Sequence, residues 1–423
     1  MHRSKTPISP SPADRKLMRN HTKEKSMKSS TRTATIAALA AGVLAFTAGC
    51  ASSSGDVAAS GGDPVSIGFI APLKGSNAVA AKAMVNAAEL AIAEVNAGGG
   101  INGRNVELKI YDDELSPDVA SRVATRAITV DEVPVLVGGL SSAEGLAIRE
   151  VAERSEVPYL ASASSAAGIT KDAKFTFRVA ATALDQANAV VDIANALGLK
   201  NAAIMFDNGA VGPALSGMFQ SRAKETGLAS GGSPVEYVLA GTDLSGPVKS
   251  AAAQKPDVLL VGGSTGADHG LLAKTMVEQG LLVPIIGLAG VGFPDAFSVG
   301  GGAYDQLPGA YFPSSVDMNK PRFKEFHAAY EAKYGKAQLA DAAVQSYDAV
   351  RIAAEGLRAT NGTGGKALND AISAMKPLDG AAGRSGSTIS FGESRDGLRG
   401  SFLVVYRSAK NANSIASDVT IGK

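Results

Sequence analysis

Apolar and polar residues follow two alternating patterns along this chain. Short apolar runs, which are typical of buried parallel strands, alternate with longer segments whose apolar residues recur every three or four positions, as on one face of a helix. One such series begins near residue 65 and a second near residue 184. Strands that alternate with helices predict an α/β fold with parallel sheets covered by helices on both faces, and two series predict two lobes. The expected strands are residues 65–70, 106–111, 135–137, 157–160, 202–206, 235–239, 258–261 and 283–286.

The C-terminal part of the chain follows a different order. Helical spacing of apolar residues predicts two successive helices, at residues 321–334 and 339–358. Two short apolar runs follow, at residues 388–391 and 402–406, with an Asp-Gly turn between them. We therefore expect a hairpin to close the chain.

The stretch from residue 135 to residue 144 carries the first candidate for a site. Three apolar residues run into two glycines, and Ser141 and Ser142 then open a predicted helix. A helix that begins at the carboxyl end of a parallel strand points N–H groups and hydroxyls beyond the sheet edge, where its dipole favours an anion. The next strand also ends in serines, within residues 161–165. These two strand ends predict a shared anion site, with helix capping as the alternative role of Ser142 and Ser165.

Composition removes several classes of function. With 423 residues the chain is long enough for two domains, and its net charge of +1 gives no electrostatic reason to expect binding to nucleic acid. Two of its four histidines lie in the N-terminal leader, which leaves little basis for a histidine metal site. We therefore expect no metal, no cofactor and no catalytic residue.

The N-terminal residues have the pattern of a secretory signal. Basic residues follow Met27, and the apolar run at residues 34–46 is too short to span a bilayer. Small residues then precede Cys50, the only cysteine of the chain, and resemble a bacterial lipobox. We interpret residues 1–49 as leader and signal peptide, with translation starting at Met27, and residues 50–63 as a flexible tether. This predicts a secreted protein, lipid-anchored through Cys50 to the outer face of the cell membrane; the alternative is a plain signal peptide followed by an incidental cysteine.

Five stretches together resemble the leucine/isoleucine/valine-type solute-binding proteins of ABC importers. They are Gly-Gly-Gly-Ile-Asn-Gly-Arg at residues 98–104, Tyr-Asp-Asp at 111–113, Gly-Gly-Leu-Ser-Ser at 138–142, Val-Pro-Tyr-Leu-Ala-Ser-Ala-Ser at 157–164 and Tyr-Asp-Ala-Val at 347–350. The resemblance covers about residues 65–406 and implies the type I periplasmic-binding-protein fold, with two Rossmann-like lobes joined by a three-crossing hinge. It also implies a function without chemistry, in which an amino acid of the branched-chain type or a related small carboxylate is bound between the lobes and delivered to ABC permease and ATPase subunits.

The resemblance also divides the chain into lobes. Lobe 1 would comprise residues 64–183 and 313–399, and lobe 2 would comprise residues 184–312 and 400–423. The crossings would lie near residues 179–184, 309–313 and 397–402. Lobes of this kind close around a ligand by hinge motion.

Ten residues are candidates for contact with the ligand: Asn77, Ala80, Ser142, Ala163, Ser164, Ser165, Val211, Ser264, Thr265 and Ala289. By resemblance, Ser142 would hold the ligand carboxylate, helped by backbone and a hydroxyl from the loop that contains Ser164 and Ser165. The other half of the predicted site departs from the family. Where the family has an aromatic residue, a tyrosine and an acidic residue that pairs with the ligand ammonium, this chain has Ala80, Val211 and Ala289. Since a buried ammonium without an acidic partner is costly, a carboxylate with a larger or uncharged remainder would suit these replacements.

Two alternative functions fit parts of the sequence. Gly262 to Gly266 match the G-x-S-x-G pattern of a hydrolase nucleophile, with Ser264 as the nucleophile, after an apolar strand. The later histidines argue against it, since His269 is too close along the chain and His327 lies among aromatic residues of a predicted helix. The second alternative is a sensor of the same fold that reports ligand to a receptor.

Two further motifs have simple interpretations. Asp112 and Asp113 follow a predicted strand, and acidic residues there are usually solvated or capping, so we expect no catalytic pair. The glycine-rich residues 98–103 follow a helix and lack the Lys-Ser/Thr ending of a phosphate loop, so a turn is expected.

Overall fold

The computed structural model describes residues 62–74, 77–209, 211–263, 265–336, 341–399 and 401–422. The predicted signal peptide, Cys50, almost all of the tether and Ser264 lie outside these residues. Within the described part of the chain, no helix combines the length and the apolar character that a membrane span requires.

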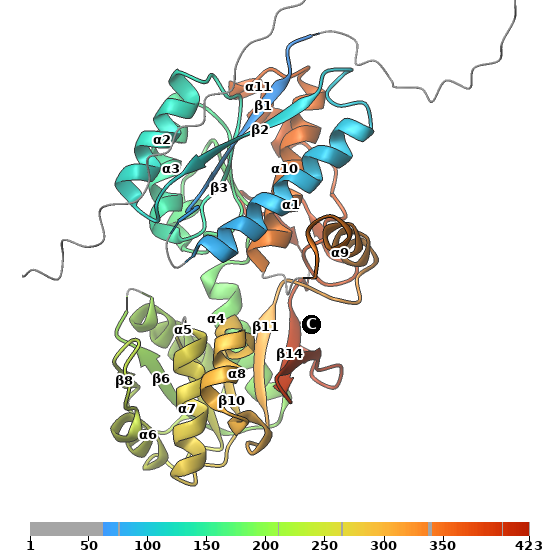
Figure 1. Cartoon of the computed structure of the whole chain (residues 1–423). Helices are drawn as coiled ribbons and strands as arrows, with labels where there is room; N and C mark the ends of the chain where they lie inside the picture. Colours follow the sequence, from blue (N-terminus) through green and yellow to red (C-terminus); the bar gives the residue numbers. More distant parts are fainter. Residues whose placement is uncertain are drawn as a thin grey trace, which may run out of the picture. The chain divides into compact units, whose positions relative to one another are not determined.

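The first sheet has five parallel strands between residues 65 and 178, in the order β2-β1-β3-β4-β5. Figure 1 labels three of them, β1, β2 and β3. All seven residues of β1 are buried, which explains why this strand consists mostly of apolar residues. β1 lies between β2 and β3, so chain order reverses direction at this strand. The strands are β1 (Val65–Ala71), β2 (Val106–Asp112), β3 (Leu136–Gly138), β4 (Tyr159–Ala161) and β5 (Thr176–Arg178).

Helices cover both faces of the first sheet (Figure 1). The long helices α1 and α10 pack together on one face, and the small side chains of α1, such as Ala81 and Ala88, are fully buried there. α2 and α3 pack together on the opposite face. Three helices around the first sheet come from the same part of the chain as its strands and three from a later part. They are α1 (Ala78–Ala97), α2 (Pro117–Thr129), α3 (Ser142–Ser155), α9 (Pro321–Tyr334), α10 (Asp341–Ala359) and α11 (Gly365–Ser373), with the short η2 (Ala167–Ile169).

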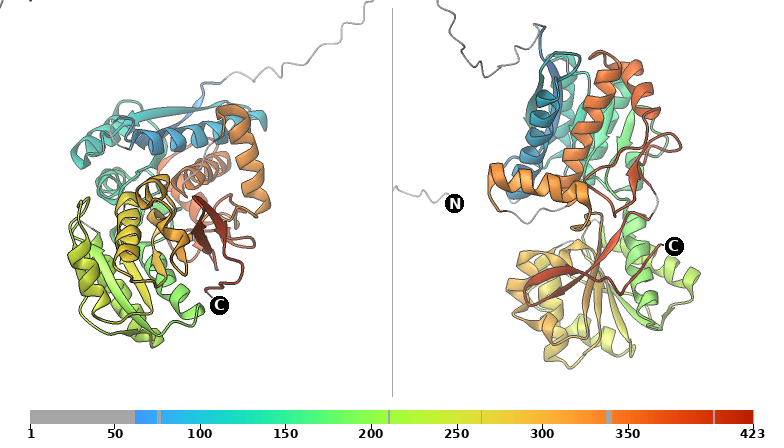
Figure 2. Two further views of the ribbon diagram at one scale, coloured as in Figure 1. Left: turned by 60° about the horizontal axis from the view of Figure 1, so that its bottom comes forward. Right: turned by 90° about the vertical axis from the view of Figure 1, so that its right-hand side faces the viewer.

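The second sheet has eight strands within the described residues, in the order β15-β14-β11-β10-β9-β6-β7, and β8 also pairs with β6. All its pairs are parallel except those of β14 and β15, which add the C-terminal segment to its edge (Figure 2). The strands are β6 (Asn201–Asp207), β7 (Ala229–Ser230), β8 (Val235–Tyr237), β9 (Val258–Gly262), β10 (Ile285–Gly287), β11 (Ala310–Ser314), β14 (Val404–Ala409) and β15 (Ala412–Ile415).

Helices also cover both faces of the second sheet. α4 and α5 pack together against β9, and α6 and α7 lie against the opposite core. α4 starts with a capping box, in which the hydroxyl of Thr182 accepts a hydrogen bond from the N–H of Asp185 and the carboxylate of Asp185 accepts one in return. The helices are α4 (Ala183–Ala196), α5 (Gly212–Thr226), α6 (Ser245–Ala252), α7 (Gly266–Glu278) and α8 (Pro294–Gly300), with η3 (Ala289–Gly292) and η4 (Ala303–Asp305).

The predicted α/β class with parallel sheets is confirmed, and a strand forms at each of the eight predicted places. A hairpin forms at the predicted place, but its predicted second strand is wrong. The short strand β12 (Thr388–Ile389) pairs with β13 (Leu398–Arg399), beyond the Asp-Gly turn. Of the expected second strand at residues 402–406, residues 404–406 belong to β14 and pair with β11. An apolar run in the sequence predicts a strand but does not predict which strand it pairs with.

The lobe boundaries stay a prediction, and two strands refine the places where the chain leaves a sheet. β5 extends the first sheet to Arg178, immediately before the first expected crossing. β11 occupies residues 310–314, so the chain leaves the second sheet after Ser314, later than the expected 309–313.

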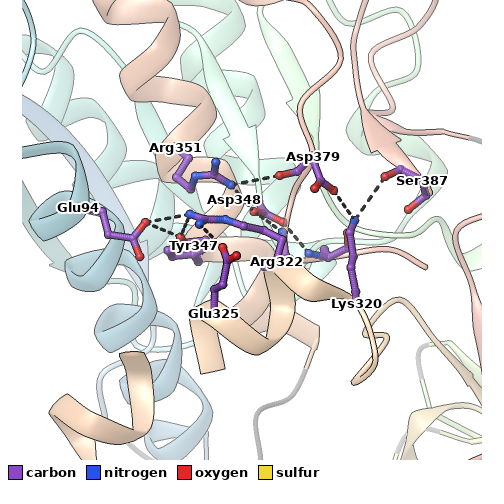
Figure 3. A network of polar contacts seen from close by, with 11 residues as sticks. Glu94, Lys320, Arg322, Glu325, Tyr347, Asp348, Arg351, Asp379 and Ser387 are labelled. Carbon is purple, nitrogen blue, oxygen red and sulfur yellow. Dashed lines mark hydrogen bonds and ion pairs between the residues drawn. The ribbon is translucent and has the colours of Figure 1, made fainter. Parts of the chain in front are cut away.

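A polar network holds residues 379–387, in the irregular segment after α11, against α10 and the start of α9 (Figure 3). Lys320 is only 2% exposed, and its Nζ donates to the carbonyls of Ala382 (2.9 Å) and Ser387 (3.3 Å) and lies 3.3 Å from Asp379 Oδ1. The buried carboxylate of Asp348 accepts the backbone N–H group of Ala382 at 2.7 Å. Side chains of the helical region therefore position a segment that has little regular structure of its own.

Gly138 should tolerate no side chain. Its φ is +124°, and a Cβ there would lie 2.1 Å from the carbonyl oxygen of Ile70. Gly198 is a matched control because its φ of +74° is also positive, but nothing lies within 4 Å of its Cβ position. Gly198→Ala incurs the strain of the left-handed region, about 1–2 kcal/mol, and the φ of Gly138 lies further from the conformations open to alanine, so its strain is no smaller. We expect Gly138→Ala to lose at least about 2 kcal/mol more unfolding free energy than Gly198→Ala in urea denaturation. Equal losses would contradict the close approach of β1 and β3.

Candidate functional site

The candidate site residues follow the carboxyl ends of strands. In the first sheet, Asn77 and Ala80 follow β1 and Ser142 follows β3, and these two strands are neighbours. In the second sheet, Val211 follows β6 and Thr265 follows β9, which are neighbours as well. Loops after adjacent parallel strands diverge where strand order reverses, and the crevice they leave is the usual ligand site of such sheets. Both sheets therefore present their candidate residues at this point.

The remaining candidates follow the next strands outward. Ala163, Ser164 and Ser165 follow β4, the neighbour of β3, and Ala289 opens η3 directly after β10, the neighbour of β9.

Ser142 is placed to donate a hydrogen bond to an anion. It is the first residue of α3, where backbone N–H groups lack partners within the helix. Its Oγ accepts the N–H of Ala166 at 3.1 Å, and no acceptor among the described residues takes its hydroxyl hydrogen. This contact also joins the loop after β3 to the loop after β4.

Ser164 supports this loop pair from below. It is fully buried, and its Oγ lies within hydrogen-bonding distance of two carbonyl oxygens, those of Ser141 (2.8 Å) and Gly139 (3.1 Å). Because its hydroxyl hydrogen is engaged with the backbone, its side chain is poorly suited to hold a ligand. Ser165 and Ala163 are half-buried, and the Ser165 hydroxyl makes no hydrogen bond to a described residue. The first sheet thus offers Ser142, Ser165 and nearby backbone as donors.

Buried acidic residues lie under the same loops, which sequence reasoning missed. Asp113 was expected to be solvated or capping, but it is fully buried; its Oδ1 accepts the N–H of Leu115 at 3.0 Å. Burial raises the pKa of Asp113 to about 6, and the nearby Glu144 adds to the shift. Glu144 accepts a hydrogen bond from the Ser141 hydroxyl, and Tyr159 Oη donates to the carbonyl of Gly138 at 3.1 Å. These polar groups fix the loop from beneath.

The second sheet presents a less polar set of candidates. Thr265 is the N-cap of α7, where its Oγ accepts the N–H of Asp268 at 3.2 Å. Val211 is exposed and Ala289 is half-buried. Beneath them lie four buried polar residues, Asp207, Tyr237, Asp268 and His269. Of these, the sequence analysis had considered only His269, as an unsuitable catalytic base.

His269 supports the loops rather than acting as a catalytic base. Its Nδ1 lies 2.6 Å from the carbonyl oxygen of Thr265, which can only accept, so Nδ1 carries the hydrogen. Burial lowers the pKa of His269, so the ring is neutral near pH 7. A Cβ at Gly287 would lie 2.7 Å from Nε2, so the ring fills the space that this glycine leaves. In a hydrolase triad the same nitrogen would donate to a carboxylate.

His327 makes the packing contacts expected of it. Its ring stacks on Phe323 with centroids 5.4 Å apart. Within the described residues, no group of three or more metal-ligating side chains gathers.

One signal in the sequence pointed to the missed acidic residues. Asp113 follows β2 directly, and Asp207 is the last residue of β6. Asp113 was predicted to be solvated or capping, because the sequence does not show which loops from distant parts of the chain cover it.

The sequence profile of the family described as periplasmic binding protein matches residues 64–404, and the chain belongs to this family. Members of the family are binding proteins, and membership implies a location outside the cytoplasm. Leu/Ile/Val-binding protein homolog 8 of Brucella melitensis is 28% identical over 358 residues, which are 80% of this chain and 87% of that protein.

Solved structures share the fold. A leucine-binding protein from Thermotoga maritima superposes with a TM-score of 0.71 at 23% identity, covering 84% of this chain and 98% of that chain. A solute-binding protein of an ABC transporter from Rhodopseudomonas palustris, in complex with 3,4-dihydroxybenzoic acid, gives a TM-score of 0.67 at 24% identity, with the same coverage of 84% and 98%.

Asp113→Asn should remove a pH dependence of stability. The folded-state pKa of about 6 lies above the value of about 3.9 usual for an unfolded chain. The stability contributed by Asp113 is therefore fully present below about pH 4 and is lost as the pH rises through about 6, a decrease of up to about 3 kcal/mol. Asp113→Asn lacks this decrease, so its unfolding free energy should gain on the wild type between about pH 4 and pH 7.

The neighbouring Asp112→Asn is the control, with the opposite sign. Partial burial opposes the shift, but the N–H groups of Glu114 and Leu73 and the charge of Lys74 outweigh it and lower the pKa of Asp112. Its contribution is present above the unfolded pKa and is lost in acid. Parallel pH profiles of Asp113→Asn and the wild type would show that Asp113 is not buried as described.

Proposed function

We propose that the protein is the lipid-anchored solute-binding component of an ABC importer, which captures a small carboxylate between two lobes and delivers it to the permease. The observation that carries the proposal is a pair of hydroxyls at adjacent strand ends. Ser142 begins α3 at the point where strand order reverses, and Ser165 lies in the loop after the neighbouring strand β4. Neutral donors at a helix N-terminus hold an anion without introducing a fixed counter-charge.

Hinge closure would bring the second half of the site to the ligand. In this proposal lobe 1 comprises residues 64–183 and 313–399, lobe 2 comprises residues 184–312 and 400–423, and three crossings connect them. Ala80, Val211, Thr265 and Ala289 then line the remainder of the ligand, together with Asn77, Ala163 and Ser264. A closed, liganded form is the one that a permease can select.

The ligand that we propose is chosen from the polar and apolar halves of the site and from the relatives. Relatives named for leucine, isoleucine and valine favour a branched-chain amino acid. The relative solved with 3,4-dihydroxybenzoic acid shows that the same fold also accepts a carboxylate without an ammonium group. Since Ala289 and Val211 offer no charge to an ammonium, we propose a carboxylate with an uncharged remainder as the better ligand, with a branched-chain amino acid as the other candidate.

Thermal-shift and calorimetric titrations with L-leucine, L-isoleucine and 3,4-dihydroxybenzoic acid test this function. A ligand that binds only the folded state raises the melting temperature. Tight binding of leucine without binding of the benzoic acid would overturn the preference for an uncharged remainder. No shift with any amino acid or small carboxylate would overturn the proposed function itself.

Ser142→Ala should weaken binding of whichever compound binds the wild type by about 10- to 100-fold, since a hydrogen bond to a charged group is worth about 1.5–3 kcal/mol. Ser155→Ala is the matched control, because Ser155 is exposed at the other end of the same helix. Equal affinity of the two variants would remove Ser142 from the site.

Cys50→Ser should abolish membrane anchoring. The wild type is expected in the detergent phase of a Triton X-114 extract and to incorporate labelled palmitate, because small residues precede its only cysteine. The Cys50→Ser variant should move to the aqueous phase and carry no label, and Ser52→Ala should behave as the wild type. A Cys50→Ser variant that stays in the detergent phase would leave only a plain signal peptide.

A further inference from the structure

A buried arginine ends the last strand of the first sheet. Arg178 is only 2% exposed, and its Nε donates to Oδ1 of Asp396 at 2.8 Å, while Nη2 lies 2.7 Å from the same oxygen. Nη2 also donates to the hydroxyl of Thr170 at 3.0 Å, and that hydroxyl donates to Asp396 Oδ1 at 2.9 Å. The three side chains thus form a closed triangle of polar contacts.

The remaining amino group of this arginine reaches the candidate ligand loop. Nη1 donates to the carbonyl oxygens of Ser165 (3.0 Å) and Ala166 (2.7 Å). The N–H of Ala166 donates to the hydroxyl of Ser142. Arg178 and Ser142 therefore hold the same residue of the loop, one through its carbonyl group and the other through its N–H group.

The loop is also tied to the chain segment that leads to the second sheet. Arg178 is the end of β5, and Ala183 begins α4, which packs against the second sheet. The N–H of Ala183 donates to the carbonyl of Ser165 at 3.0 Å, so this carbonyl accepts from Arg178 and from the first residue of α4. A shift of the Ser165 carbonyl thus acts on both ends of the connection at residues 179–182.

A second connection is fixed by the backbone of the same residue. The N–H of Arg178 donates to the carbonyl of Arg395, and the N–H of Gly397 donates to the carbonyl of Arg178, both at 2.8 Å. From here the chain runs through β13 to β14, which belongs to the second sheet. Arg178 therefore lies at the start of two connections between the sheets.

Only an arginine has the donors for this arrangement. A planar guanidinium presents five N–H donors in a fixed fork, whereas a lysine ammonium has three donors on one atom. Here the guanidinium bridges a carboxylate, a hydroxyl and two carbonyls that come from different parts of the chain. A burial of this kind is costly unless the charge is paired, and Asp396 supplies the pair.

We propose that Arg178 is a positioning residue that couples ligand contact at Ser142 and Ser165 to the two connections between the sheets. The proposal rests on the solute-binding function proposed above. A carboxylate that engages the loop after β4 fixes the carbonyls that Arg178 holds, and through them the near ends of residues 179–182 and of the segment after Gly397. When ligand is present, the near ends of both connections are therefore held in place during hinge rotation.

Arg178→Lys tests the coupling. It keeps the charge beside Asp396 but cannot keep both loop carbonyls. L-leucine or 3,4-dihydroxybenzoic acid, whichever binds the wild type, should bind this variant about 3- to 30-fold more weakly, the range expected for a residue that couples two places without touching the ligand. The ligand-induced decrease in radius of gyration, measured by small-angle X-ray scattering, should also be smaller.

A double-mutant cycle separates coupling from general stability. Arg178→Lys combined with Ser142→Ala should weaken binding by less than the product of the two single effects, because both act through Ala166. Arg222→Lys is the matched control, since Arg222 makes a two-contact pair with Asp192 between α4 and α5, and its affinity should stay within about 2-fold of the wild type. Wild-type affinity and full compaction in Arg178→Lys, or a purely multiplicative cycle, would overturn the proposal.

Two further measurements test the proposal if Arg178→Lys does not fold or if neither compound binds the wild type. Asp396→Asn keeps the arginine and its loop contacts, so it serves where Arg178→Lys does not fold, and it should reduce compaction with a smaller loss of affinity. Amide hydrogen exchange needs no ligand: in Arg178→Lys the amides of Ala166 and Ala183 should both exchange faster than in Arg222→Lys. Unchanged exchange at both amides would refute the positioning role even if neither compound binds, whereas failure of ligand binding in the wild type alone would count against the proposed function.

Discussion

Parallel pairing of strands is the constraint on which the rest of this structure depends. In the first sheet all strands run parallel, and in the second all do except the two C-terminal ones, so the carboxyl ends of the parallel strands meet at one edge of each sheet. Each sheet is built outward from a strand with neighbours on both sides, β1 in one and β6 in the other. The loops that follow these strands diverge, and such a position is the usual ligand site of parallel sheets. Asn77, Ala80 and Ser142 in the first sheet and Val211 and Thr265 in the second follow the strands at this point.

Polar groups beneath each edge hold these loops in place. Asp113, Glu144 and Tyr159 lie under the loop that carries Ser142, and His269 lies under the loops of the second sheet. Burial opposes the charged forms of Asp113 and His269, so these groups support the loops at some cost to stability. A loop that must keep its shape while its ligand comes and goes benefits from such support, since unpaired backbone groups would otherwise leave it mobile.

Most elements of the fold could be predicted from local pattern, and the failures have physical causes. The apolar run of β1 and the proline start of α9 are visible in the sequence because burial on both faces and helix initiation leave local signatures. β5 was not recognised because Thr176-Phe177-Arg178 forms no apolar run, whereas the equally short β3 and β10 lie within apolar runs. Residues 402–406 were assigned to a hairpin, although residues 404–406 pair with β11. The partner of a strand is set by chain segments that folding brings beside it, and no local pattern specifies it.

For the site, the sequence by itself determined the α/β class, the family resemblance and the serine-rich strand ends that include Ser142 and Ser165. Only the tertiary structure decided what each of these side chains does. Ser164 resembles its neighbours in sequence, but its hydroxyl is buried against the carbonyls of Ser141 and Gly139. Arg178 and Asp396 lie far apart in the chain, and their pairing arises where β5 meets a later segment. Hydrogen bonds and burial depend on groups brought together by folding, and this dependence is the physical reason that the sequence indicated candidate positions for a site but not the residues that support them.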